Sequence, residues 1–332
     1  MKTVVLEQPG RFTLTETAQP GAPGPDEVLV RVLTVGICGT DLHAFEGTQP
    51  FFTYPRILGH ELAVEVIETG DGVGDFRPGD LCAVNPYMTC GKCAACVCGR
   101  TNCCVKMCVI GVHSDGGMRD LILLPAKQMY KCEKLPPEQI PLVETLAVGI
   151  HAVGRAAVQR GERAIVAGAG PIGLSVIEFL RLASADIAVV EKMSERLAFA
   201  VRHYGLKRYY PSHEEARQEE PSMLVFDCTG DRSSMEQSIH LLQQGGKLIF
   251  VGLINDHVSL FDPDIHRREA TILASRNSTP AEHHRVLQSM ESGQIDIGGW
   301  PTEYARPTTI HQRFPAWLHR EAGVVKAVVD WS

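Results

Sequence analysis

The chain has 332 residues, of which 44% are hydrophobic and 21% charged, and its formal net charge is −7. This length exceeds what one ordinary hydrophobic core holds, so we expect two domains. No block of lysine or arginine stands out in the sequence. The charge pattern therefore disfavours nucleic acids and anionic membrane surfaces as partners.

The N-terminal segment resembles no export signal. It contains one lysine and a three-residue apolar run before Glu7, too short for the apolar part of a signal peptide. No run in the chain approaches the roughly 18 apolar residues of a membrane-spanning helix. We therefore expect a cytoplasmic protein with no membrane partner. In such a chain, eleven cysteines point to metal binding more than to disulfides.

The first part of the chain, to about residue 134, has the pattern of a β-rich domain. Short apolar runs are separated by Gly, Pro and Asp, and the clearest predicted strands are 27–35, 63–68 and 120–124. A helical pattern follows at 141–158.

The second part alternates strands with helices, a pattern typical of a parallel sheet wrapped by helices. Its predicted strands are 164–167, 187–190, 223–226, 247–251 and 271–275. After a helix at 281–292 the tail ends in an apolar strand at 324–329, which we expect to return to the first domain. We predict an α/β fold, with a β-rich domain at 1–147 completed by about 289–332, and a doubly wound Rossmann domain at 148–288.

A glycine-rich loop opens the predicted Rossmann domain. Gly168-Ala169-Gly170-Pro171-Ile172-Gly173 follows an apolar strand and precedes an apolar helix, as a dinucleotide-binding loop does. Gly168 permits the tight turn, Gly170 lets the backbone approach a pyrophosphate, and Gly173 allows close packing of helix and strand. We include Pro171, Ile172, Thr229 and Gly252 among the cofactor-binding candidates.

Glu191 ends the next strand at the offset expected for a ribose-binding acid. Its carboxylate would accept hydrogen bonds from both ribose hydroxyls and repel a 2′-phosphate, which favours NAD(H) over NADP(H). Lys192 and Arg196 lie close in sequence, so NADP(H) stays the less favoured alternative.

Seven of the eleven cysteines fall between Cys90 and Cys108. The spacing C-x2-C-x2-C-x7-C is suited to a tetrahedral structural zinc site, with thiolates from Cys90, Cys93, Cys96 and Cys104. Cys98, Cys103 and Cys108 could replace one of these ligands or form a redox pair.

A second, dispersed set of donors suits a catalytic zinc ion. Cys38, His60, Glu61 and Glu144 supply a thiolate, an imidazole and carboxylates, and three ligands leave a coordination position open for substrate. Adjacent residues on a regular strand point to opposite faces, so His60 and Glu61 bind together only if the backbone there is irregular. Glu61 and Glu144 therefore need not ligate at the same time.

The segment 36–41, the Gly59-His60-Glu61 motif, the cysteine lobe and the glycine loop, in this order, resemble the zinc-containing medium-chain alcohol dehydrogenases. Glu144, followed by Val148-Gly149-Ile150-His151-Ala152, resembles the sorbitol and threonine dehydrogenase branch. The segments 54–56, 111–117 and 274–277 are similar to bacterial sugar-acid dehydrogenases of the L-gulonate and L-galactonate type.

This resemblance implies a GroES-like catalytic domain beside the Rossmann domain, and an enzyme that transfers hydride between NAD and a small polyhydroxy substrate. Cys38, His60, Glu61 and Glu144 would hold the catalytic zinc. Thr40 would contact the substrate hydroxyl, His43 would pass its proton onward, and Asp41 would orient His60. The resemblance also implies a homo-oligomer, either a dimer or a tetramer.

Arg276 ends a predicted parallel strand, where ligands of α/β sheets bind, and its guanidinium could hold a substrate carboxylate. A salt bridge or a contact with cofactor phosphate is an equal alternative. We predict oxidation of a sugar acid or polyol. The alternatives are L-threonine or another small alcohol as substrate, and a non-enzymatic NAD-binding sensor or scaffold.

Overall fold

The computed structural model describes residues 1–50, 52–318 and 324–332. They form two compact units, one of residues 1–144 with 279–332 and one of residues 145–278. The sequence-based boundaries, after residues 147 and 288, both lie further along the chain than these. Among the described residues, no helix is both long enough and apolar enough to cross a bilayer.

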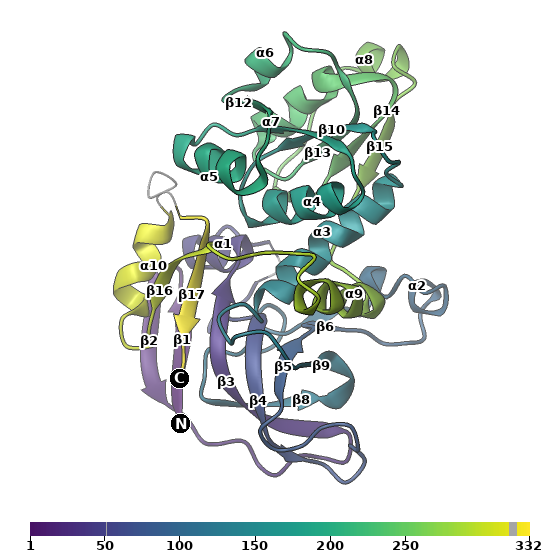
Figure 1. Ribbon diagram of the computed structural model, residues 1–332. Helices are drawn as coiled ribbons and strands as arrows, with labels where there is room; N and C mark the ends of the chain where they lie inside the picture. The colour runs from purple at the N-terminus through teal and green to yellow at the C-terminus, as the bar shows by residue number, and fades with distance from the viewer. Residues whose placement is uncertain (51, 319–323) are drawn as a thin grey trace. The chain divides into compact units, whose positions relative to one another are not determined.

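The first unit is built on a mixed seven-stranded sheet with the order β16-β17-β3-β4-β5-β9, in which β8 also pairs with β3 (Figure 1). The strands of this sheet are β3 (Glu27–Ile37), β4 (Glu61–Thr69), β5 (Leu81–Val84), β8 (Leu121–Pro125), β9 (Met129–Cys132), β16 (Pro301–Ala305) and β17 (Lys326–Asp330). Two small antiparallel pairs complete the unit: β1 (Lys2–Gln8) with β2 (Arg11–Glu16), and β6 (Tyr87–Met88) with β7 (Cys108–Val109).

The helices of this unit are short. They are α1 (Gly39–Glu46), α2 (Ala94–Val97), α9 (Pro280–Glu291) and α10 (Ile310–Leu318), with 3-10 turns η1 (Thr101–Cys103) and η2 (Ala126–Gln128). The long helix α3 (Leu142–Ala156) begins in this unit and continues in the next.

The C-terminal tail belongs to the first unit because its apolar residues complete that unit's core. β17 pairs antiparallel with β3, matching Val329 to Val35. Phe314 of α10 is fully buried and contacts Phe12 and Phe45, with ring centroids 4.9 and 5.0 Å away. The described part of the tail thus lies in the sheet and core of the first unit.

The second unit contains a parallel six-stranded sheet with the order β12-β11-β10-β13-β14-β15. Its strands are β10 (Arg163–Ala167), β11 (Asp186–Val190), β12 (Arg208–Tyr210), β13 (Ser222–Asp227), β14 (Leu242–Phe250) and β15 (Thr271–Ala274). The connecting helices are α4 (Pro171–Leu182), α5 (Ser194–Tyr204), α6 (His213–Ala216), α7 (Arg232–Gln237), the 3-10 turn η3 (Ser238–Leu241) and α8 (Asp262–His266).

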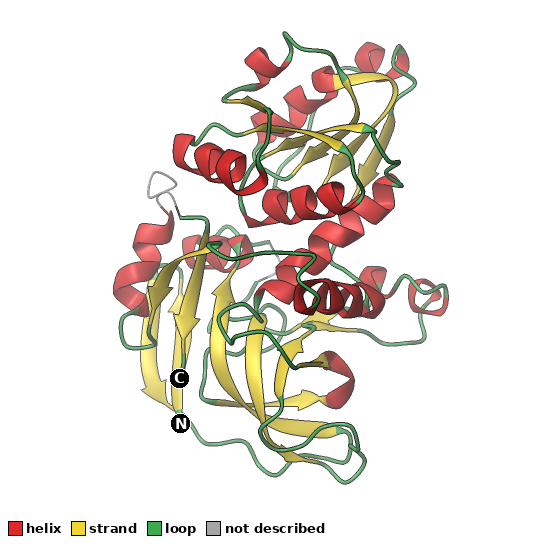
Figure 2. Ribbon diagram, in the orientation of Figure 1, coloured by secondary structure: helices red, strands yellow, loops and turns green. Residues whose placement is uncertain are grey.

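Helices cover both faces of this parallel sheet (Figures 1 and 2). On one face, Ala216, Ile239 and Leu241 pack with Ile165, Val225 and other strand residues in one apolar cluster. α4 packs on the other face against β10 and β11. This doubly wound sheet and the mixed sheet of the first unit confirm the predicted fold class.

We predict that Phe314→Ala destabilises the first unit by about 3–5 kcal/mol, because it leaves a cavity among Phe12, Phe45 and Trp317. Thermal unfolding followed by circular dichroism would measure this. Tyr304→Ala is the control, since that ring is 51% exposed. Equal melting temperatures for the two variants would contradict the assignment of the tail to this core.

Candidate active site

Three donor residues meet where an antiparallel pair of strands ends. Cys38 directly follows β3 and precedes α1, while Glu61 is the first residue of β4. Gly36 pairs with Glu61 across the two strands, so the end of β3 lies beside the start of β4. The sulfur of Cys38, a ring nitrogen of His60 and a carboxylate oxygen of Glu61 all lie within 4.8 Å of one another.

The backbone here is irregular, which resolves the expected conflict between His60 and Glu61. His60 lies outside the strand that Glu61 begins, and Gly59 before it has a φ of +97°. At Gly36, a β-carbon would lie 2.1 Å from Oε2 of Glu61. Glycine at this position therefore leaves the room that the Glu61 carboxylate occupies.

Asp41 links two members of this group. Its Oδ2 accepts a hydrogen bond from the backbone N–H of Cys38 (2.9 Å), and its Oδ1 faces Nδ1 of His60 at 3.6 Å. A carboxylate on this side of the ring is suited to orienting the imidazole of His60.

The donor group fits a zinc ion by its chemistry and by its charge. Burial acts to lower the pKa of His60, but the charge of Asp41 and the contact with Cys38 outweigh it, so the pKa lies well above its usual value. Burial raises the pKa of Asp41 although His60 opposes this. Three buried carboxyl groups, those of Asp41, Glu61 and Glu144, belong to this part of the unit, and with the soft thiolate of Cys38 they suit a divalent cation such as zinc.

Glu144 lies near these donors but is held by a tyrosine. Among the described residues, the group within 4.8 Å comprises Cys38, His60 and Glu61 without Glu144. The hydroxyl of Tyr87 donates a hydrogen bond to Oε1 of Glu144, and both side chains are buried. Burial raises the pKa of Glu144, although the charge of His60 opposes the shift.

A buried lysine that the sequence analysis missed is paired with Glu61. The ammonium of Lys326 lies 2.6 Å from Oε1 of Glu61, and Lys326 is 2% exposed. Burial acts to lower the pKa of Lys326, but Glu61 outweighs it and the pKa is raised. A signal was present, because Lys326 is the one charged residue within the apolar run 324–329.

Thr40 and His43 lie on α1, three positions apart and hence on neighbouring turns of one face. Thr40 is half-buried and His43 exposed. The Nδ1 atom of His43 lies 3.5 Å from Oε2 of Glu46 and 3.3 Å from the hydroxyl of Thr48. Of the two, Thr40 is therefore the more enclosed and His43 the more accessible to solvent.

The four-cysteine lobe is also assembled. The sulfurs of Cys90, Cys93, Cys96 and Cys104 lie within 4.8 Å of one another, whereas Cys98 and Cys103 are exposed. Backbone N–H groups of Val105 and Cys96 lower the pKa of Cys93 to about 6, whereas burial raises the pKa of Cys96 to about 12. All eleven cysteines are free, and the lobe fits a structural zinc ion.

The glycine loop connects β10 to α4. Gly168 has a φ of +93°, and Gly170 caps α4 with Pro171 and Ile172 as its first residues. A β-carbon at Gly173 would lie 1.8 Å from the carbonyl oxygen of Gly168, so only glycine fits this turn. Free N–H groups at the start of α4 are suited to a pyrophosphate.

Glu191 is tied to this loop. Its Oε2 accepts a hydrogen bond from Ala169 N–H (2.7 Å), and its Oε1 accepts one from Met193 N–H (2.8 Å). Arg196 approaches the loop from α5, with Nη1 3.7 Å from the position of a β-carbon on Gly170. The loop therefore has a carboxylate and a guanidinium beside it.

The other cofactor and substrate candidates follow the carboxyl ends of neighbouring strands. Thr229 follows β13 and donates to Oδ1 of Asp227 (2.6 Å), and Gly252 follows β14 and packs against Gly230. Arg276 follows β15 and is exposed. Ligands of open α/β sheets bind along this edge.

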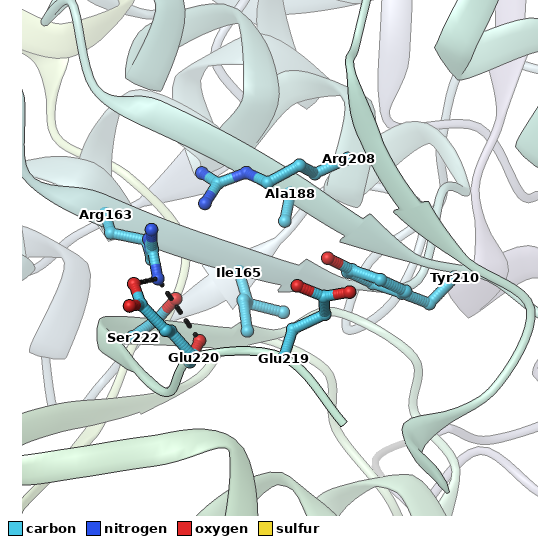
Figure 3. Close-up of a pocket in the computed structure, with 8 residues that line it drawn as sticks. All are labelled: Arg163, Ile165, Ala188, Arg208, Tyr210, Glu219, Glu220 and Ser222. Atoms are coloured by element: carbon cyan, nitrogen blue, oxygen red, sulfur yellow. Dashed lines mark hydrogen bonds and ion pairs between the residues drawn. The ribbon is translucent and has the colours of Figure 1, made fainter. Parts of the chain in front are cut away.

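A pocket of about 240 Å³ lies at the opposite edge of the same sheet (Figure 3). Arg163, Arg208 and Ser222, at the amino ends of their strands, contribute to its wall. Arg163 is paired with Glu220 at 2.6 Å, and Arg208 with Asp186. With both guanidinium groups neutralised, this pocket offers no surplus positive charge to a dinucleotide phosphate.

Two family models match the chain. Residues 24–137 match the alcohol dehydrogenase GroES-like domain, and residues 171–292 match the zinc-binding dehydrogenase model.

Known proteins are similar over the full length. L-galactonate-5-dehydrogenase of Escherichia coli K12 is 36% identical, and the match covers 100% of this chain and 99% of that protein. A zinc-binding dehydrogenase from Sinorhizobium meliloti 1021, solved with NADP, has 30% identity and a TM-score of 0.91, with 99% of each chain covered. The alcohol dehydrogenase RspB of E. coli CFT073, solved with NADH, has 25% identity and a TM-score of 0.91, with 100% and 99% covered.

We predict that Gly36→Ala displaces the Glu61 carboxylate, because the new methyl group would lie 2.1 Å from its Oε2. The affinity for the zinc ion bound outside the cysteine lobe should fall by about 10- to 100-fold. Zinc content after dialysis against a graded chelator would measure this. Gly39→Ala is the matched control, since no atom lies within 4 Å of its added β-carbon. Unchanged zinc affinity in Gly36→Ala would refute the assignment of Glu61.

We predict that Lys326→Met destabilises the metal-free protein by about 3–5 kcal/mol, because Glu61 is left as a buried charge without its cation. Zinc should restore much of this loss, since it supplies positive charge to the same carboxylate. Melting temperatures with and without zinc would show a larger zinc-induced rise in the variant. Lys131→Met, which breaks an exposed pair with Asp80, should change little. An equal zinc-induced rise in melting temperature in wild type and Lys326→Met would contradict the role of Lys326 in compensating the charge of Glu61.

Proposed function

We propose that this protein, which belongs to the zinc-containing alcohol dehydrogenase family, oxidises a secondary alcohol of a sugar acid with NAD as hydride acceptor. Membership confirms the expected family, the oxidoreductase activity, and zinc and a nicotinamide dinucleotide as cofactors. The observation that carries the proposal is the buried group of Cys38, His60 and Glu61 in a chain similar over its full length to L-galactonate-5-dehydrogenase.

The protein's own residues would prepare the substrate hydroxyl. When bound, zinc lowers the pKa of a hydroxyl group and so eases its deprotonation. Cys38, His60 and Glu61 would hold the ion, and Asp41 would keep the imidazole of His60 oriented.

The proton would leave along α1. Thr40 would accept the hydrogen bond from the substrate hydroxyl, and His43 would take up the proton at its imidazole and release it to water. The half-buried Thr40 and the exposed His43, on neighbouring turns, support this direction.

The cofactor would bind along the carboxyl edge of the parallel sheet, with its pyrophosphate at the start of α4. Glu191 supports NAD over NADP because its charge repels a 2′-phosphate. Arg196 beside the loop is the feature that favours NADP, and both cofactors occur in the similar structures described above. The cytoplasmic location and the homo-oligomeric assembly expected from the sequence stay predictions.

The function is tested by NADH formation with the zinc-loaded protein on L-galactonate, L-gulonate, L-idonate, sorbitol, galactitol and L-threonine. We expect kcat/KM for one aldonate to exceed that for the polyols and threonine by at least about 10-fold, equivalent to 1.4 kcal/mol. Chelation of zinc should abolish turnover, and NADP should replace NAD poorly. Preference for threonine or a polyol would overturn the substrate class.

Arg276 is the residue we propose to bind the substrate carboxylate. Arg276→Ala should lower kcat/KM for the aldonate by about 10- to 100-fold, as loss of a charged hydrogen bond does, and leave the matching polyol within about 2-fold. Arg267→Ala is the control, because Arg267 lies at the end of α8 rather than at the carboxyl end of a strand, and pairs there with Asp264 at 2.8 Å. Equal losses on both substrates would assign Arg276 to the cofactor or to structure.

A further inference from the structure

Tyr87 makes a buried hydrogen bond to Glu144 that the reaction described above does not use. Tyr87 lies on β6, and its hydroxyl donates to Oε1 of Glu144 on α3. Both residues belong to the first unit, as do Cys38, His60 and Glu61. The hydrogen bond therefore joins β6 to the start of α3 inside this unit.

The backbone of Tyr87 is fixed by its neighbours. Its N–H donates to the side-chain oxygen of Asn85 at 2.9 Å. Asn85 is itself held by Gln128 through two hydrogen bonds, from Asn85 N–H to the Gln128 carbonyl (2.8 Å) and from Gln128 Nε2 to the Asn85 carbonyl (2.7 Å). These hydrogen bonds therefore hold the backbone at Tyr87 in place.

The ring of Tyr87 is packed by a buried histidine. His283 of α9 lies edge-on to Tyr87 with centroids 6.2 Å apart, and stacks on Tyr130 at 5.4 Å. Burial lowers the pKa of His283 to about 4, so the imidazole is neutral near pH 7 and packs as an aromatic ring. Aromatic packing on one side and a fixed backbone on the other restrict where the Tyr87 hydroxyl can lie.

Glu144 is close enough to the donor group to interact with its charges. His60, Glu61 and Lys326 all act on the Glu144 carboxylate. Tyr87 stays protonated, since burial and then the charge of Glu144 raise its pKa well above the usual value. Tyr87 thus holds one oxygen of a carboxylate that lies within electrostatic range of the donor group.

We propose that Tyr87 is a positioning residue that holds the Glu144 carboxylate back from the zinc site and so keeps the fourth coordination position open for substrate. This deepens the proposed function and rests on it for its catalytic consequence. Its effect on metal binding stands independently of any substrate.

The expected effect of removing the Tyr87 hydroxyl follows from the hydrogen bond that Glu144 would lose. Without the Tyr87 hydroxyl, Oε1 of Glu144 is a buried acceptor whose strongest donor is gone, which is costly for a charged group. A cation is the best replacement partner in these surroundings. The carboxylate should therefore turn towards the zinc ion and occupy the position that substrate needs.

The experiment compares Tyr87→Phe with Tyr130→Phe, which also removes a hydroxyl from a ring packed on His283. We expect Tyr87→Phe to lose catalytic zinc to a chelator about 10-fold more slowly than wild type, and its kcat to fall by about 10- to 100-fold. The cobalt-substituted variant should show a changed visible absorption spectrum. Tyr130→Phe should retain zinc as wild type does.

A purely structural role for Tyr87 predicts the opposite, namely faster loss of zinc in Tyr87→Phe, and that result would overturn the proposal. Glu144→Gln supplies a second test that leaves Tyr87 in place. If Tyr87 holds the carboxylate away, Glu144→Gln keeps the wild-type rate of zinc loss within about 2-fold, whereas loss of a true ligand accelerates it by about 10-fold or more. In the double variant, the effect of Tyr87→Phe should vanish.

The two proposals fail separately. If wild type oxidises no member of the substrate panel, the proposed function fails, while zinc release and the cobalt spectrum still report on Tyr87. If wild type is active and Tyr87→Phe releases zinc faster, the positioning role alone is refuted.

Discussion

The structure of the first unit depends on compensating several carboxylates buried at one end of its sheet. A buried carboxylate without a partner costs several kcal/mol, so each must find a donor or a cation locally. Each here has a different partner: the Cys38 N–H for Asp41, the Lys326 ammonium for Glu61 and the Tyr87 hydroxyl for Glu144. These partners come from distant parts of the sequence, which ties α1, β6 and β17 to the same place.

This constraint explains why the C-terminal tail must return to the first unit. β17 adds an apolar strand beside β3, and it also brings in Lys326 as the cation for Glu61. A tail that packed elsewhere would leave Glu61 buried without the Lys326 ammonium. Folding of the tail and formation of the metal site are therefore linked.

Much of the site could be predicted because its residues lie in short motifs. Cys38 and His60 are each embedded in a local sequence pattern, and the cysteine lobe has a zinc-like spacing. The parallel strands were also recognisable, apart from β12, whose three residues are too few to show a period. Tyr87 and Lys326 act through contacts 57 and 265 residues away in sequence. The lone charge in the apolar run 324–329 marks Lys326 but does not identify Glu61 as its partner, and Tyr87 has no comparable local signal.

Glu61 and Glu144 have different interaction partners, and this difference bears on which carboxylate is the better candidate for a metal ligand. Glu61 is paired with a cation, and Gly36 leaves space for its carboxylate beside Cys38 and His60. The ammonium of Lys326 contacts both oxygens of Glu61, and each oxygen keeps a further lone pair that can face a second cation. Glu144 instead accepts a hydrogen bond from a hydroxyl on a packed ring, which restrains the position of its carboxylate. The two carboxylates therefore differ in the charge of their partner, which is a neutral hydroxyl for Glu144 and a cation for Glu61.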